Sequence, residues 1–131
     1  MDILHPADWP RPKGYSNAVI AEGRFIFLAG IIGWTVQEEL PDHTLTGQLR
    51  QALQNIKTIL AEADCTPYHI VRMTWYVKDM DCYRQQREKI GRIYRAEFGK
   101  VFPAMTCVAV TELVEPDAQI EIEVTAAYPN A

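Results

Sequence analysis

The sequence has few of the features that mark a disulfide-stapled or metal-binding protein. It contains only three cysteines, Cys65, Cys82 and Cys107, and no CxxC pair. An odd number of cysteines without that spacing argues against a disulfide framework or a zinc site. The three histidines share no ligand spacing, so we expect no metal, and nothing in the sequence calls for another cofactor. A reduced, cytoplasmic protein is the simplest interpretation.

Long apolar runs and basic clusters are also missing. No apolar run approaches the roughly 18 residues that cross a bilayer, and the opening MDILHPADWPRP lacks the charged and apolar regions of a signal peptide. The net charge is −4, and lysines and arginines are scattered. We therefore expect neither a membrane nor a nucleic acid as partner, and this charge argues against a ribonuclease.

The composition that remains is typical of one folded domain covering residues 1–131. Hydrophobic residues make up 48% of the chain and charged residues 23%. A chain of this size buries roughly two-thirds of its unfolded surface, so it needs no covalent staple.

The first half of the chain predicts an extended arm, a hairpin and a helix. The arm covers the proline-rich residues 1–13, and strand-like runs at 16–21 and 24–30 flank a turn at Glu22-Gly23. From Thr44 apolar residues recur at helical spacing to about Ala63, which predicts an amphipathic helix with Gln48 on its polar face.

The second half predicts a strand, a helix and two more strands. HIVRMTWYVKD alternates as a strand, with Val71, Met73, Trp75 and Val77 on one face and Ile70, Arg72, Thr74 and Tyr76 on the other. Asp79 or Asp81 caps a helix that runs to about Phe98. Strands at 104–112 and 118–128 close the chain.

The resulting order, ββαβαββ, predicts an α+β two-layer domain. Two helices cannot cover both faces of its sheet. The second face mixes apolar residues with polar ones (Arg72, Thr74, Tyr76, Glu121 and Glu123), which favours burial against another subunit.

Six segments, in this order and spacing, resemble the Rid family of reactive-intermediate (imine/enamine) deaminases, also called YjgF-like proteins. They are GYSNAV, FLAGIIG, NIKTILAEADC, VRMTWYVKDM, FPAMTCVAV and IEIEVTAAYP. The resemblance implies a chorismate-mutase-like fold and a homotrimer whose sheets line a central barrel. It also implies a cleft for a small-molecule metabolite at each subunit interface, without a cofactor.

The same resemblance assigns site residues around one cleft. Glu121 matches the glutamate that activates water, and Cys107 matches a cysteine whose backbone carbonyl holds that water. Tyr15 and the backbone of Ile31 match ligand contacts. The family binds the substrate carboxylate through the arginine of a PAR stretch, but here the stretch reads PAM and Met105 takes that position.

The residues' own chemistry leaves alternatives open. Met105 marks either a lost activity or a less acidic or more aromatic ligand, since a thioether binds no carboxylate by charge. Trp34 follows Gly33 before a polar loop and is expected to line the cleft. Arg11 and Lys13 in the arm are candidates for a replacement cation. A Cys107–His nucleophile is disfavoured, because no histidine lies near it in the sequence.

Two functions follow from this interpretation. In the first, the chain hydrolyses a reactive imine or enamine metabolite, with an atypical substrate preference because of Met105. Some relatives have a site asparagine on the second helix, at a position that falls near Gly91 in this sequence. The resemblance therefore implies that the contact made by this asparagine is also changed. In the second, the chain forms a non-catalytic, small-metabolite-binding or regulatory trimer.

Overall fold

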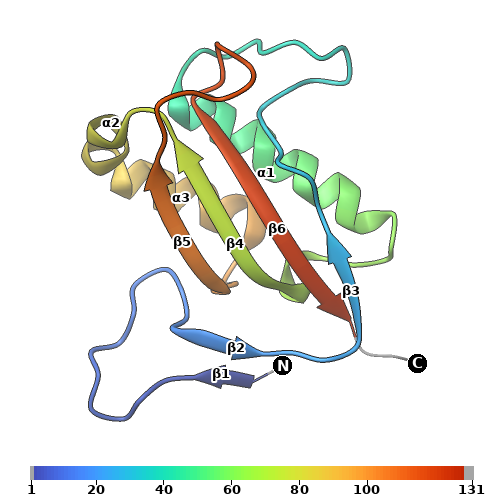
Figure 1. The fold of residues 1–131 in the computed structure, drawn as a ribbon, viewed down its shortest axis with the longest axis vertical. Coiled ribbons are helices and arrows are strands. Elements are labelled where there is room, and N and C mark those ends of the chain that lie inside the picture. The colour runs from blue at the N-terminus through green and yellow to red at the C-terminus, as the bar shows by residue number, and fades with distance from the viewer. Residues whose placement is uncertain (1, 129–131) are drawn as a thin grey trace.

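A four-stranded sheet with helices on one face forms the body of the protein (Figure 1). The structure is a computed structural model that describes residues 2–128. The sheet order is β3-β6-β4-β5, with β3 at Arg24–Phe27, β6 at Ile120–Tyr128, β4 at Ile70–Val77 and β5 at Ala104–Ala109. Strands β4 and β5 are parallel, and the other neighbours are antiparallel. The predicted α+β two-layer architecture is confirmed.

Helix α1 (Leu45–Ala61) begins where the sequence predicts, because the Thr44 side chain caps it by accepting a hydrogen bond from the Gly47 N–H at 3.0 Å. Its apolar face is buried against the sheet. The prediction for Gln48 was wrong, since this side chain is only 1% exposed. The Gln48 Nε2 donates to the carbonyls of Asp42 and Asp117, and its Oε1 accepts from the Gln119 N–H. The polar Gln48 side chain can be buried because its amide forms hydrogen bonds with backbone groups of two loops.

The second helix is divided in two, α2 (Met80–Gln85) and α3 (Arg87–Phe98), at Gln86. Asp79 is the N-cap of α2 and accepts from the Cys82 N–H at 3.0 Å. Gly99 follows α3 with a φ of 76°, a conformation that glycine adopts without strain. A short 3₁₀ helix, η1 (Pro67–His69), leads into β4.

Strand β4 follows the predicted alternation except at its start. Met73, Trp75 and Val77 are buried, but Ile70 is also buried, while Val71 is partly exposed. The register with β6 shifts between Ile70 and Arg72, which leaves Val71 as the extra residue of a β-bulge. A bulge of this kind interrupts strict alternation.

The N-terminal segments pair differently from the prediction. Strand β1 (Asp2–Leu4) pairs with β2 (Ala18–Ile20), and β3 pairs with β6. The predicted 16–21/24–30 hairpin is therefore wrong. The segment predicted as an extended arm does begin with an extended strand, but this strand is paired with β2, and residue 1 lies outside the described residues. The Ser16 N–H donates to the Pro103 carbonyl at 3.1 Å, which fixes the chain beside the start of β5. The β1–β2 pair consequently lies beyond the end of the main sheet (Figure 1).

The face of the sheet that the helices leave uncovered is partly apolar. Phe25 and Phe27 stack on it with ring centroids 6.2 Å apart and are 48% and 76% exposed. The Tyr76 hydroxyl donates to Glu123 Oε1 at 3.2 Å, so these two polar side chains are paired on the same face.

Candidate functional site

Two pockets divide the predicted site residues between them. We call the first the glutamate pocket, about 500 Å³ in volume; it includes Glu121, Ile31 and Trp34. We call the second the arginine pocket, about 590 Å³; it includes Tyr15, Met105 and Cys107 together with Arg84, Arg87 and Arg95. A single chain therefore does not bring the six predicted residues into one cluster.

The cause of this division is the register of the sheet. Met105 pairs with Met73 and Cys107 with Trp75 across the parallel strands β4 and β5. Residues that pair directly point to the same side of a sheet, and Trp75 is buried in the helix layer. Glu121 pairs instead with Tyr76, so its side chain belongs to the opposite face.

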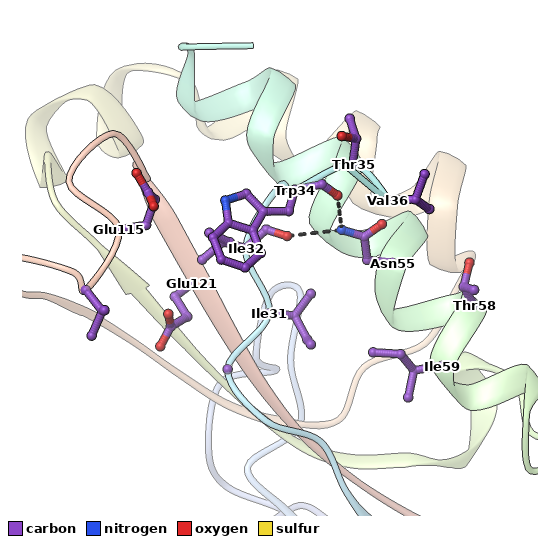
Figure 2. A pocket seen from close by; sticks show the side chains of 12 residues that line it. Ile31, Ile32, Trp34, Thr35, Val36, Asn55, Thr58, Ile59, Glu115 and Glu121 are labelled. Carbon is purple, nitrogen blue, oxygen red and sulfur yellow. Dashed lines mark hydrogen bonds between the residues drawn. The ribbon is translucent and has the colours of Figure 1, made fainter. Parts of the chain in front are cut away.

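Glu121 extends from β6 toward the segment of residues 30–36 in the glutamate pocket (Figure 2). A Cβ atom at Gly30 would lie only 2.4 Å from Glu121 Oε2. Gly30 therefore leaves the space that the carboxylate occupies. Ile120 and Ile122, on either side of Glu121, are fully buried in the core, as the strand pattern predicts.

Ile31 lies beside β6 in an isolated antiparallel bridge. Its N–H donates to the Ile122 carbonyl and its carbonyl accepts from the Ile122 N–H, both at 2.8 Å. The Ile31 N–H is therefore committed to the sheet. Only its carbonyl, which has a second lone pair, retains capacity for a ligand.

Asn55 on α1 holds the same segment in place, and the sequence reasoning missed it. Its Nδ2 donates to the carbonyl oxygens of Ile32 and Trp34 at 3.1 and 2.8 Å (Figure 2). Trp34 is consequently fixed at the rim of the glutamate pocket and is partly exposed, whereas Trp75 is 2% exposed. A polar residue on a helix is usually solvated, so no sequence signal distinguished Asn55.

The thiol of Cys107 and the hydroxyl of Tyr83 meet in the arginine pocket. Burial raises the pKa of the Cys107 thiol, and the neighbouring Tyr83 hydroxyl offsets part of this rise. Burial and the proximity of Cys107 raise the pKa of Tyr83 to about 12, although Arg87 opposes the shift. Both groups are neutral near pH 7, so the geometry does not favour Cys107 as a thiolate nucleophile.

Three arginines of the arginine pocket were not singled out from the sequence. Arg84 comes from α2, and Arg87 and Arg95 come from α3. Of the two cations proposed in the arm, Lys13 lines this pocket, and Arg11 lines a neighbouring cavity. The available signal was the spacing of Arg87, Gly91 and Arg95, which places them on one face of a helix.

The part of the chain that the structure describes holds no group of three or more His, Cys, Asp or Glu side chains arranged to bind a metal ion. Among the same residues, 2–128, no helix has the length and apolarity needed to cross a membrane.

Comparisons with known proteins agree on the family of this chain. Residues 9–128 match the profile described as endoribonuclease L-PSP. A RutC family protein of Pyrococcus horikoshii is 33% identical over 95% of this chain and 96% of its own. The crystal structure of YyfB from Yersinia pestis, of the conserved Rid protein family, covers 97% of this chain and 98% of its own at 30% identity, with a TM-score of 0.86. The crystal structure of Escherichia coli TdcF with bound serine covers 98% of this chain and 99% of its own at 25% identity, with a TM-score of 0.69.

Proposed function

This chain belongs to the endoribonuclease L-PSP family, the Rid or YjgF-like proteins, and on that premise we propose that it hydrolyses the C=N bond of a small imine. An enamine would enter the same reaction after protonation to the imine. Water adds to the imine carbon, the carbinolamine expels ammonia, and a ketone or aldehyde remains. No metal or organic cofactor takes part, because imines hydrolyse with only orientation and proton transfer to assist them.

The observation that carries this proposal is the Glu121 carboxylate, which lies in the glutamate pocket beside Gly30. Glu121 is separated from Met105 and Cys107, which lie on the opposite face of the sheet. A site that uses all three residues needs two chains, with the glutamate pocket of one subunit facing the arginine pocket of its neighbour. The exposed Phe25 and Phe27 on the uncovered face support association of that face. We propose a homotrimer, in which every subunit contributes to two such clefts.

In the assembled cleft, Glu121 acts as the general base. Its carboxylate accepts a proton from the attacking water, and the backbone carbonyl of Cys107 accepts a hydrogen bond that holds this water. Glu121 then returns the proton to the departing nitrogen. Such a positioned base usually contributes about 10²–10⁴ in rate.

Met105 sets the substrate preference in this proposal. The serine bound by the relative TdcF supports a small, amino-acid-like ligand for this chain. A methionine offers an apolar, polarizable contact but no charge. Residue 105 therefore does not bind the carboxylate of the substrate.

The test is ammonia release from imines that an amino acid oxidase generates in situ, with the parent chain and Glu121→Gln compared. Glu123→Gln is the matched control, since Glu123 lies on the same strand and face but outside both pockets. We expect Glu121→Gln to lose two to four orders of magnitude and Glu123→Gln to keep its activity. Equal turnover by Glu121→Gln and the parent would remove Glu121 as the base.

The alternative is a trimer that binds a metabolite without catalysis, and the neutral Met105 is the observation that favours it. In that case ammonia release would stay at the uncatalysed rate with every imine tested, while a metabolite still bound the cleft. RNA cleavage, which the family description mentions, is less compatible with a net charge of −4.

A further inference from the structure

The arginine pocket combines an aromatic wall with positive charge. Its aromatic residues are Tyr15, Trp75, Tyr83, Tyr94 and Phe102, and its cations are Lys13, Arg84, Arg87 and Arg95. No aspartate or glutamate of residues 2–128 lines it. A concave site with this composition is suited to an anion that carries a ring or a large apolar group.

The cations differ in how available they are. Within residues 2–128, Arg84 pairs with Asp81 at 3.5 Å, and the other ion pair is between Lys57 and Glu97. Arg87 and Arg95 have no carboxylate partner in this part of the chain. Their guanidinium groups can also bind a carboxylate through two parallel hydrogen bonds, which the ammonium of Lys13 cannot.

Arg87 and Arg95 lie on the same face of α3, on either side of Gly91. They lie four residues on either side of Gly91, so the three residues occupy successive turns of one helix face. The Arg95 side chain folds back over the glycine, with its Nη1 3.2 Å from the position of a Cβ at Gly91. Burial raises the pKa of the Tyr83 hydroxyl, and Arg87 lies close enough to Tyr83 to oppose part of this larger rise. Arg87 and Arg95 line the arginine pocket, whereas Arg92, also on α3 and likewise exposed, does not.

We propose that Arg87 and Arg95 form the carboxylate-binding site of this pocket, in place of the neutral residue at position 105, and that the ligand is a carboxylic acid with an aromatic side chain. The inference rests on the proposed function only in taking this ligand to be the imino acid substrate. The carboxylate lies between the Arg87 guanidinium and the Arg95 guanidinium that covers Gly91, and the ring lies against Met105 and the aromatic wall. The carboxylate is bound by arginines of α3, whereas Met105 belongs to β5. A short aliphatic acid held by these arginines would therefore leave the space next to Met105 unfilled.

Titration calorimetry at low salt tests the binding step without any chemistry. The probes are phenylacetate and phenylacetamide, which have the same shape but differ in charge. We expect the parent chain to bind phenylacetate at least about tenfold more tightly than the amide. The double variant Arg87→Gln/Arg95→Gln should lose that preference and leave binding of the amide unchanged. Arg92→Gln, as the matched control, should behave as the parent.

Several results would overturn the inference. One is equal affinity of the parent for phenylacetate and phenylacetamide, and another is no measurable binding of phenylacetate to the parent. The inference is also wrong if the double variant keeps the preference for phenylacetate, or if Arg92→Gln loses it. The variants remove exposed side chains, so circular dichroism should show an unchanged fold.

Hydrolysis of the phenylalanine-derived imine separates this inference from the proposed function. If the parent hydrolyses it and the double variant has the same kcat/KM, the arginine site is wrong and the hydrolase stands. If neither protein hydrolyses an imine but phenylacetate binding depends on the arginines, the hydrolase is wrong and the binding site stands.

Discussion

Glu121 and Cys107 lie on opposite faces of the same sheet, because each pairs with a different one of two successive β4 residues, Tyr76 and Trp75. Successive residues of a strand point to opposite sides. No change of rotamer can therefore bring the Glu121 carboxylate to the side of the sheet where the Met105 and Cys107 side chains lie, and β4 separates the Cys107 carbonyl on β5 from Glu121 on β6. A shared cleft requires a second chain, and this requirement can be tested.

Two inactive variants should restore activity when they are mixed. Glu121→Gln removes the base, and Met105→Glu places a negative charge in the arginine pocket. Co-refolded trimers contain interfaces in which both contributions are intact, so we expect up to about a quarter of the parental activity from an equal mixture. Each variant alone should stay inactive. If the mixture remains inactive although sedimentation shows mixed trimers, the shared cleft is wrong.

The substitution Met105→Arg should broaden the substrate range toward short imino acids. An arginine at this position adds a charge-assisted contact to the carboxylate, worth about 1.5–3 kcal/mol. We expect kcat/KM for the imine of alanine to rise by at least about tenfold. Met105→Leu is the control for size without charge. An unchanged rate with Met105→Arg would show that residue 105 does not face the substrate.

The substitution Gln48→Leu should strongly destabilise the fold. It leaves the Gln119 N–H and the carbonyls of Asp42 and Asp117 without the Gln48 amide. We expect the free energy of unfolding in urea to fall by about 2–4 kcal/mol. Gln54→Leu, at an exposed position of the same helix, should change it by no more than about 0.5 kcal/mol. Equal stability of the two variants would contradict the role of Gln48.

Alanine substitutions at Gly91, within α3, and at Gly99, at its C-terminal end, should change the stability of the protein in opposite directions. Gly91 lies within the helix, and a Cβ there would meet only the flexible Arg95 side chain. Gly91→Ala should therefore stabilise the protein by about 0.5–1 kcal/mol. Gly99 has a φ of 76°, so Gly99→Ala should destabilise it by about 1 kcal/mol. Thermal unfolding of both variants measures these effects; shifts of the same sign would contradict the helix geometry.

Tyr83 should make the fold sensitive to alkaline pH. Burial and Cys107 raise its pKa to about 12 from the ordinary value of 10. A raised pKa in the folded state favours the protonated form, so this contribution to stability is complete below pH 10 and is lost as the pH rises toward 12. Tyr83→Phe should flatten the fall in unfolding free energy over that range. Tyr68→Phe, at a position 68% exposed, should not change the slope.

Local patterns sufficed for α1, for the two ends of the segment that forms α2 and α3, and for most of the sheet, but not for the division at Gln86. Helix α1 follows from the spacing of its apolar residues and from the Thr44 cap, both of which are encoded within a few residues. The Asp79 cap and the Gly99 stop are equally local. The alternation of Ile120, Glu121 and Ile122 also predicted which side chains enter the core, since the period of a strand is a property of its own backbone.

Only the tertiary structure decided which residues meet. Gln48 is buried because two distant loops present their backbone groups to it. Arg87 and Arg95 line the same pocket as Met105 because α3 lies on the face of the sheet to which Met105 and Trp75 point. The sequence by itself determined the family, helix α1 and the inward and outward faces of β6 and of most of β4. The register between strands depends on pairing over long separations, so only the fold could place Glu121 and Cys107 on opposite faces of one sheet.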